Sequence, residues 1–207
     1  MTFNGFTPQD FATFMIPGLA ERMEAIETRI RPKFRYIGQR ATDQLSMQLN
    51  QEMFLHIAKH ARRTVNPPQD TWLAIANNKR GYKKHPHFQV GIFDDHIFIW
   101  LAFIYELPTK SQIASTFIDA QEMFDELPND FVVSLDHMKK DATPLATLDK
   151  EAALKRFRDV KKAEFLIGRH IKKDDPILQD GTALLTKIES TFDALVPLYQ
   201  LAYQDFN

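Results

Sequence analysis

The chain has 207 residues, a length typical of one domain, here expected to span residues 1–207, and its formal net charge at pH 7 is −1. It contains no cysteine, which excludes disulfides, thiolate nucleophiles and metal sites that need thiolate ligands. The longest apolar run, residues 97–105, falls far short of the roughly 20 residues that a membrane-spanning helix needs. Because the N-terminal residues also lack the features of a secretory signal, we expect a cytoplasmic protein that does not contact membranes.

The first part of the chain predicts helices. Thr7, Pro8 and Asp10 form a helix-start pattern, in which Thr7 caps the helix and Pro8 occupies a position that needs no N–H. Over residues 17–45, apolar side chains recur every three or four positions, which indicates a long amphipathic helix that Pro32 must kink or divide. We expect this helix to cover one face of a sheet.

Strands are predicted in the middle of the chain. Residues 53–60 fit both the helical and the strand period, and we favour a strand, whereas residues 71–76 are apolar on both faces and predict an interior strand. Residues 88–92 alternate between apolar side chains and polar or small ones, and a two-residue turn follows at 94–95. The next strand, residues 97–105, is apolar on both faces and is expected to lie at the centre of the sheet.

The second half of the chain alternates helices and strands. Apolar spacing predicts helices over residues 113–127, 149–160 and 182–203, and strands over residues 131–135 and 165–171. Helices thus cluster toward the two ends of the chain and strands toward its middle. This distribution predicts an α+β fold, a single domain with a central antiparallel or mixed sheet of about five to six strands covered by N- and C-terminal amphipathic helices.

Charge is distributed unevenly along the chain. Residues 51–89 contain seven Lys or Arg against two Asp or Glu, and residues 90–135 contain one against eight. Local potentials of this size, rather than the net charge, decide whether a protein attracts anions. Two arrangements stay open: the basic segment forms an anion-binding patch, or the basic and acidic segments face each other and neutralise.

The basic segment carries a candidate anion-binding site. Arginine presents a planar fork that matches phosphate oxygens, lysine adds point charge, and tyrosine adds a stacking surface. The candidate residues are Lys59, His60, Arg62, Arg63, Asn66, Lys79, Arg80, Tyr82 and His87. They come from two stretches that flank opposite ends of strand 71–76, so the sequence does not by itself bring them together. The competing interpretation is a solvated face of snorkelling side chains.

Catalysis and metal binding have weaker support in the sequence. His60 or His87 would serve as a proton carrier beside Arg80 in phosphate-ester chemistry, but no Gly-x-Ser-x-Gly, phosphate-loop or dinucleotide pattern is present. The seven histidines show no metal-ligand spacing, so we expect no metal and no cofactor. Catalytic residues stay unassigned.

Three functions are consistent with these patterns. The leading expectation is a cytoplasmic binding module for a phosphate-bearing anion, either a nucleotide or a nucleic acid. The second is a hydrolase or transferase that acts on a phosphorylated small molecule with a histidine proton carrier. The third is a protein-partner module that uses the acidic residues 90–135 as its interface, with no particular partner indicated. A concave pocket would favour a small molecule, and an open convex basic face would favour a nucleic acid.

Several runs together resemble the YktB-like family of small uncharacterised proteins from Gram-positive bacteria. The runs are AKHARRTVNPP at 58–68, DTW at 70–72, KRGYK at 79–83, PHFQ at 86–89 and KKAEF at 161–165. The resemblance extends over essentially the whole chain. It implies a compact single α+β domain, and it implies no activity and no catalytic residues.

Overall fold

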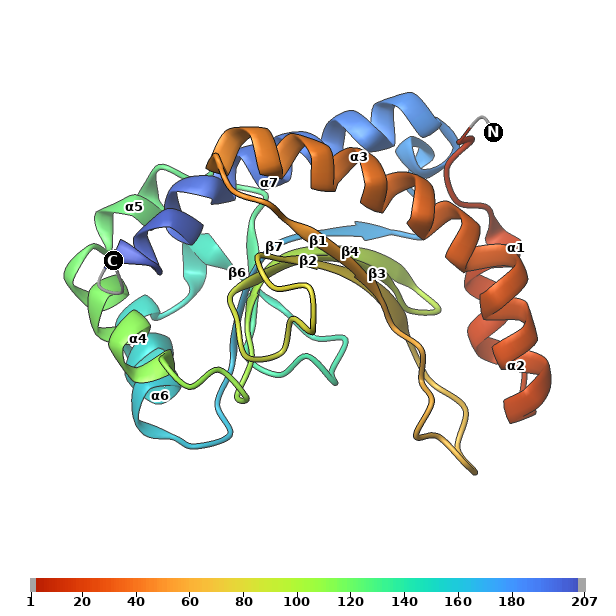
Figure 1. Ribbon diagram of the computed structural model, residues 1–207, viewed down its shortest axis with the longest axis horizontal. Coiled ribbons are helices and arrows are strands. Elements are labelled where there is room, and N and C mark those ends of the chain that lie inside the picture. The colour runs from red at the N-terminus through yellow and green to blue at the C-terminus, as the bar shows by residue number, and fades with distance from the viewer. Residues whose placement is uncertain (1–2, 205–207) are drawn as a thin grey trace.

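One antiparallel sheet of seven strands organises the protein, for which the computed structural model describes residues 3–204 (Figure 1). The strands are β1 (Phe54–Ile57), β2 (Thr71–Ala76), β3 (His87–Ile92), β4 (His96–Phe103), β5 (Val132–Ser134), β6 (Thr143–Pro144) and β7 (Phe165–Lys172). Their order across the sheet is β1-β2-β3-β4-β7-β5-β6, and every neighbouring pair is antiparallel. β4 lies at the centre, as the two apolar faces of its sequence predicted, and every residue in it is buried.

The sheet has seven strands, whereas the sequence predicted five to six. The additional strand, β6, is a two-residue segment at the edge, where Thr143 and Pro144 pair with Val133 and Val132. Both residues of β6 are exposed, so they show no alternation of apolar and polar side chains that would predict a strand. Their pairing depends on the hydrogen-bonding groups that β5 offers, which the local sequence does not reveal.

The helices occupy the two ends of the chain and the connections of its second half. In chain order the helical segments are α1 (Pro8–Ala12), η1 (Thr13–Met15), α2 (Leu19–Ala25), the π-helical η2 (Ile26–Ile30), α3 (Arg31–Leu49), α4 (Lys110–Asp119), α5 (Glu122–Asp125), η3 (Leu145–Thr147), α6 (Lys150–Asp159), η4 (Pro176–Gln179) and α7 (Gly181–Leu201). The helix predicted over 17–45 is helical without a break from residue 19 to residue 49, and its hydrogen bonding is π-helical in η2, directly before Pro32, the second residue of α3. Proline lacks the N–H that a helix interior requires, so the regular α-helical pattern changes here. Within residues 3–204 no helix has both the length and the apolar composition to cross a membrane.

α3 and α7 lie along one face of the sheet (Figure 1). The Phe88 ring of β3 packs against Phe192 and Tyr199 of α7, with ring centroids 5.0 and 5.1 Å apart. Arg40 of α3 forms an ion pair with Glu189 of α7, with Nη2 and Oε1 2.8 Å apart. The main hydrophobic core therefore lies between the sheet and this helical layer.

The opposite face of the sheet, here called the polar face, carries polar and aromatic side chains under loops. Side chains two positions apart on a strand share a face, and the strand register aligns Gln89 with Trp100 and Phe98 with His170. Loops 58–70 and 77–86 extend to this side of the sheet (Figure 1). On this face lie both tryptophans, Trp72 and Trp100, and the strand histidines His56, His87, His96 and His170.

Candidate functional site

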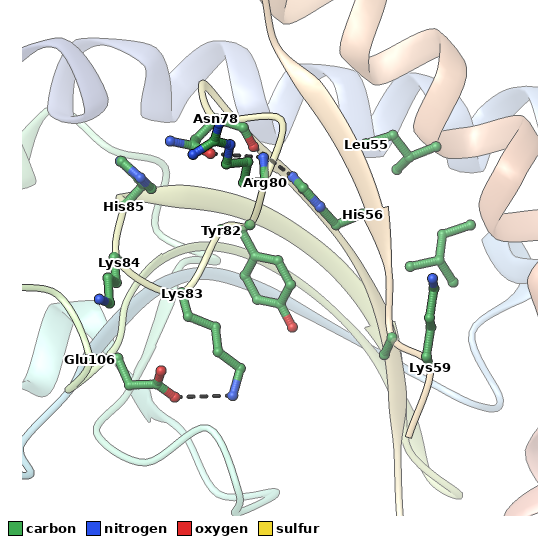
Figure 2. A pocket seen from close by; sticks show the side chains of 13 residues that line it. Leu55, His56, Lys59, Asn78, Arg80, Tyr82, Lys83, Lys84, His85 and Glu106 are labelled. Carbon is green, nitrogen blue, oxygen red and sulfur yellow. Dashed lines mark hydrogen bonds and ion pairs between the residues drawn. The ribbon is translucent and has the colours of Figure 1, made fainter. Parts of the chain in front are cut away.

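A hollow of about 750 Å³ opens between β1 and loop 77–86, and we call it the basic pocket (Figure 2). Its volume falls within the range of about 300–1,000 Å³ that small-molecule sites occupy. Its polar lining includes Lys59, Arg80, Lys83, Lys84, Tyr82 and His56. Lys59 follows the end of β1, whereas the other cations come from loop 77–86, so the two basic stretches of the sequence meet here.

Three hydrogen bonds fold loop 77–86 back over the edge of the sheet. The Arg80 backbone N–H donates to Asn78 Oδ1 at 2.8 Å, which turns the chain, and His56 Nε2 donates to the Asn78 carbonyl at 2.9 Å. Trp72 Nε1 donates to the Tyr82 hydroxyl at 3.0 Å. The loop therefore returns alongside β2, and Arg80 faces the same hollow as residues at the end of β1.

Most cations of the basic pocket have no carboxylate partner. Within residues 3–204, Lys59, Arg80 and Lys84 form no ion pair, and only Lys83 does, with Glu106 at 3.0 Å. The Lys83–Glu106 contact is also the sole ion pair that joins the basic segment 51–89 to the acidic segment 90–135 in this part of the chain. In the described residues, the basic and acidic segments are therefore joined by this one ion pair.

Tyr82 forms an aromatic wall of the basic pocket and is supported by His87 from the sheet side. Their ring centroids lie 4.9 Å apart, and His87 is completely buried. His87 Nδ1 donates to the His85 carbonyl at 2.7 Å, and Nε2 accepts from Gln89 Nε2 at 2.8 Å. Burial lowers the pKa of His87 to about 4. Because both ring nitrogens are occupied, His87 positions Tyr82 and has no free nitrogen to offer a ligand.

The other predicted residues lie outside the basic pocket. Arg63 and Asn66 line a separate hollow of about 490 Å³, and Arg63 Nη1 donates to the Asn66 carbonyl at 3.3 Å. His60 adopts a left-handed backbone conformation (φ 51°), and its Nε2 lies 3.0 Å from Thr71 Oγ1. Burial, followed by the charges of Arg63 and Arg31, lowers the pKa of His60 to about 4. Of the nine predicted residues, the structure brings Lys59, Arg80 and Tyr82 together.

Arg62 and Lys79 are exposed on their loops, and neither lines the basic pocket or the hollow beside Arg63. Within the described residues, neither of them forms an ion pair. Positive charge alone therefore does not distinguish pocket residues from their neighbours.

The sequence did not identify a second polar cluster, here called the polar slot, between Asp70 and His137. It is a narrow space of about 10 Å³ lined also by Gln89 and Ser134 and by the rings of Trp72, Trp100 and His170. His137 lies in the loop after β5. Ion pairs of Lys140 with Asp94 and Asp95 hold this loop across the polar face. The residues of the polar slot come from distant stretches of the chain, so no local sequence motif predicts the slot.

Glu164 holds His137 in place. The Nδ1 atom of His137 donates to Glu164 Oε2 at 2.7 Å, and the His137 backbone N–H donates to the same oxygen at 2.8 Å. The Tyr105 backbone N–H donates to Glu164 Oε1 at 3.3 Å. Burial lowers the pKa of His137, but the hydrogen bond and charge of Glu164 outweigh burial and raise it overall.

Asp136, His137 and Glu164 have the closest approach to metal-ligand spacing in residues 3–204, since their ligand atoms lie within 4.8 Å of one another. The Glu164 oxygens already accept hydrogen bonds from N–H groups, and Asp136 Oδ1 accepts one from the Met138 N–H at 3.0 Å. The arrangement therefore fits a carboxylate that orients a histidine better than a metal site.

Fold and site together define a class of small α+β proteins, built on one seven-stranded antiparallel sheet with helices on one face and, beside loop 77–86, a hollow lined by basic residues. The chain belongs to the family described as Domain of unknown function (DUF1054), whose model matches residues 6–199. It is 66% identical over 199 residues to a UPF0637 protein of Oceanobacillus iheyensis, across 96% of this chain and 97% of that one. It is 60% identical over 203 residues to a UPF0637 protein of Shouchella clausii (98% and 96% covered). It is 50% identical over 204 residues to a UPF0637 protein of Listeria monocytogenes (99% and 100% covered). The family resemblance of the sequence runs is confirmed.

Proposed function

We propose that the protein binds a phosphate-bearing small molecule, about the size of a mononucleotide, in the basic pocket. The observation that carries this proposal is the convergence of three cations without carboxylate partners, Lys59, Arg80 and Lys84, on one hollow within the described residues. Like charges repel when they share a concavity, and a bound anion would relieve that repulsion.

The chemistry of the lining suits a phosphate and an attached ring. Arg80 offers a planar fork of N–H donors, and Lys59 and Lys84 offer mobile ammonium groups. Tyr82, fixed through its hydroxyl to Trp72, presents a ring on which a base or sugar can stack. A concave site of this kind favours a small molecule over a nucleic acid.

The two alternative functions find less support. A proton carrier at His87 would need a free ring nitrogen, but both of its nitrogens are hydrogen-bonded and the residue is completely buried. His60, the other candidate carrier, does not line the basic pocket, and its Nε2 lies 3.0 Å from Thr71 Oγ1. A partner interface over residues 90–135 would need a continuous acidic surface, and the buried central strand β4 interrupts that segment. A cytoplasmic location, proposed from the cysteine-free composition, would place the pocket among nucleotides and phosphorylated metabolites.

The test is isothermal titration of the wild type and of Arg80→Ala with inorganic phosphate, AMP, ATP, and short RNA and DNA strands. We expect a nucleotide to bind and Arg80→Ala to weaken its affinity about 10- to 100-fold, because a hydrogen bond to a charged group contributes about 1.5–3 kcal/mol. Lys79→Ala is the matched control, since it removes the same charge from the adjacent residue outside the pocket and should change affinity less than about twofold.

Two results would count against the pocket. One is a dissociation constant above about 1 mM for every nucleotide, because binding that weak is barely specific. The other is an equal loss of affinity in Arg80→Ala and Lys79→Ala, which would mean that diffuse charge attracts the ligand. Tight binding of RNA or DNA alone, with a steep dependence on salt, would assign the basic edge to nucleic acid instead.

A further inference from the structure

A second hollow lies where the N-terminal segment meets the start of α3, and we call it the N-terminal pocket (Figure 1). Its volume is about 440 Å³, within the range of about 300–1,000 Å³ that small-molecule sites occupy. Residues from 3–10 line one side of it and residues from 28–36 line the other. It shares no lining residue with the basic pocket, so the proposed binding of a phosphate-bearing molecule leaves it without a role.

The wall that the N-terminal segment forms is fixed on two sides. Gly5 has a φ of +83°, and a Cβ atom there would lie 1.9 Å from the Leu178 carbonyl oxygen, so only glycine fits this close approach. The Phe6 backbone N–H donates to the same carbonyl at 2.6 Å, and Lys33 Nζ of α3 donates to the Gly5 carbonyl at 2.9 Å. The pocket is therefore preformed, which lowers the free-energy cost of ordering it around a ligand.

One cation of the N-terminal pocket has no partner. The charged side chains of its lining are Asp10, Arg29 and Lys33. Lys33 Nζ lies 2.5 Å from Asp10 Oδ2, so these two charges neutralise each other. Arg29 is half-buried, and within residues 3–204 its guanidinium forms no ion pair and no hydrogen bond. The pocket thus offers one unmatched positive charge to a ligand.

Arg29 belongs to η2, the π-helical turn that precedes α3. Turns of this kind are rare and often occur at functional sites. Pro32, which lacks the N–H that a regular helix needs, follows the turn and lines the same pocket. The irregular part of the helix and the unpaired cation therefore coincide at the hollow.

Aromatic rings form the apolar part of the lining. Phe3 and Tyr36 both line the pocket, and their rings are stacked, with centroids 5.7 Å apart and planes 16° from parallel. The Pro32 ring adds apolar surface beside them. Flat surfaces of this kind favour contact with another ring. A ligand that uses both parts of the lining carries a ring and a negative charge.

Asp10 limits the charge of that ligand. Its Oδ2 atom accepts from the Thr7 N–H at 2.6 Å, from Thr7 Oγ1 at 3.0 Å and from Lys33, which fixes the carboxylate in place. A second negative charge on the ligand would find no second unmatched cation in the pocket and would be repelled by Asp10. A carboxylate, with one charge, suits the pocket better than a phosphate monoester, with a charge near −2 at pH 7.

We propose that the N-terminal pocket binds a small aromatic monocarboxylate. The carboxylate pairs with Arg29, whose planar fork of N–H groups matches its two oxygens. The aromatic ring lies against Tyr36, Phe3 and Pro32. This ligand site is separate from the basic pocket and differs from it in preferring one negative charge and a ring to a phosphate.

The test is isothermal titration of the protein with phenylacetate. Butyrate lacks the ring, 2-phenylacetamide lacks the charge, and phenyl phosphate carries a second charge; phenyl phosphate is titrated into Arg80→Ala, so that the basic pocket contributes little. We expect a dissociation constant below about 1 mM for phenylacetate and binding at least about 10-fold weaker for each of the others.

Arg29→Gln should weaken phenylacetate binding about 10- to 100-fold, because it removes a hydrogen-bonded charge partner. Tyr36→Leu keeps an apolar side chain but removes the ring, and should weaken binding about 2- to 10-fold. Arg35→Gln is the matched control: it removes the same charge from an exposed position of α3 outside the pocket and should change the affinity less than about twofold. Thermal melting should show that every variant is folded.

The proposal is overturned if phenylacetate binds no more tightly than butyrate or 2-phenylacetamide, or if folded Arg29→Gln keeps the wild-type affinity. Tighter binding of phenyl phosphate than of phenylacetate would equally overturn it. Arg80→Ala should leave the affinity for phenylacetate unchanged, and Arg29→Gln should leave the affinity for nucleotides unchanged. Failure of one pocket is thus distinguished from failure of the other.

Discussion

Asp70 is a buried residue, and burial has the largest effect on the pKa of its carboxyl group, ahead of the charges of His137 and Arg63 and a hydrogen bond from its own backbone N–H. Its folded-state pKa of about 6 lies above its ordinary value of 3.8, so the folded protein holds this proton more tightly than the unfolded chain does. Below pH 3.8 both states are protonated and Asp70 costs nothing. As the pH rises from 3.8 to about 6 the unfolded chain ionises first, and stability is lost.

We therefore expect Asp70→Asn to raise the free energy of unfolding at pH 7 by about 1–3 kcal/mol, since each pKa unit corresponds to 1.36 kcal/mol. The gain should vanish near pH 4. Urea denaturation of the wild type and the variant at both pH values measures it, and Asp43→Asn, an exposed carboxylate on α3, should show no gain. A destabilised Asp70→Asn at pH 7 would mean that the carboxylate has a structural partner.

At the scale of elements, the pairing of β4 with β7 depends on Gly168. A Cβ atom at this position would lie 1.9 Å from the Ile99 carbonyl oxygen and 3.1 Å from the Trp100 ring. The clash is with the backbone of the central strand, so neither partner can move aside without separating the two strands. Gly91 is similarly restricted, because its Cβ would lie 2.0 Å from the Phe98 ring.

Gly168→Ala should lower the free energy of unfolding by about 3 kcal/mol or more, because overpacking against a fixed backbone cannot relax. Gly81→Ala is the control: no atom lies within 4 Å of its Cβ position and its φ is not left-handed, so the change should be neutral or stabilising by at most about 1 kcal/mol. Denaturant midpoints of the two variants give the comparison. Equal midpoints would contradict close packing between β4 and β7.

At the scale of the whole molecule, buried and half-buried histidines make the free energy of unfolding depend on pH. Burial lowers the pKa of His60 and His87 to about 4 and that of His170 to about 3, and His170 also feels the charge of His96. These folded-state values lie below the ordinary value of 6.5, so the unfolded chain takes up protons first as the pH falls. Stability from these groups is complete above pH 6.5 and is lost from there down to about pH 4 or below.

Between pH 6.5 and 4 we expect the free energy of unfolding to fall by at most about 1.4 kcal/mol per pH unit for the completely buried His87, and by less for the half-buried His60 and His170. Asp70 opposes this trend below pH 6, so Asp70→Asn should steepen the loss. Denaturation at intervals of half a pH unit measures how steeply the free energy of unfolding falls with pH. His170→Gln should reduce this slope by at most the contribution of one proton. A stability that stays flat from pH 6.5 to 4.5 would show that these histidines are protonated in the folded protein.

The sequence by itself determined the elements whose signals are local. Residues 71–76 form β2 with the predicted bounds, and Asp149 caps α6 by accepting from the Ala152 N–H at 2.9 Å. The central position of β4 was predicted because a strand that is apolar on both faces must be covered on both. β6 was missed, since two exposed residues become a strand only when β5 lies beside them.

Only the tertiary structure decided which polar groups meet. Lys59 and Arg80 flank opposite ends of β2, and a hydrogen-bonded loop brings them to one hollow. Asp70 and His137 meet because a loop crosses the polar face from the far edge of the sheet. Their proximity results from long-range strand register and loop docking, which depend on the whole fold. Residue type and spacing predicted which stretches are rich in cations, but they could not distinguish Arg80 from Lys79 or reveal the polar slot.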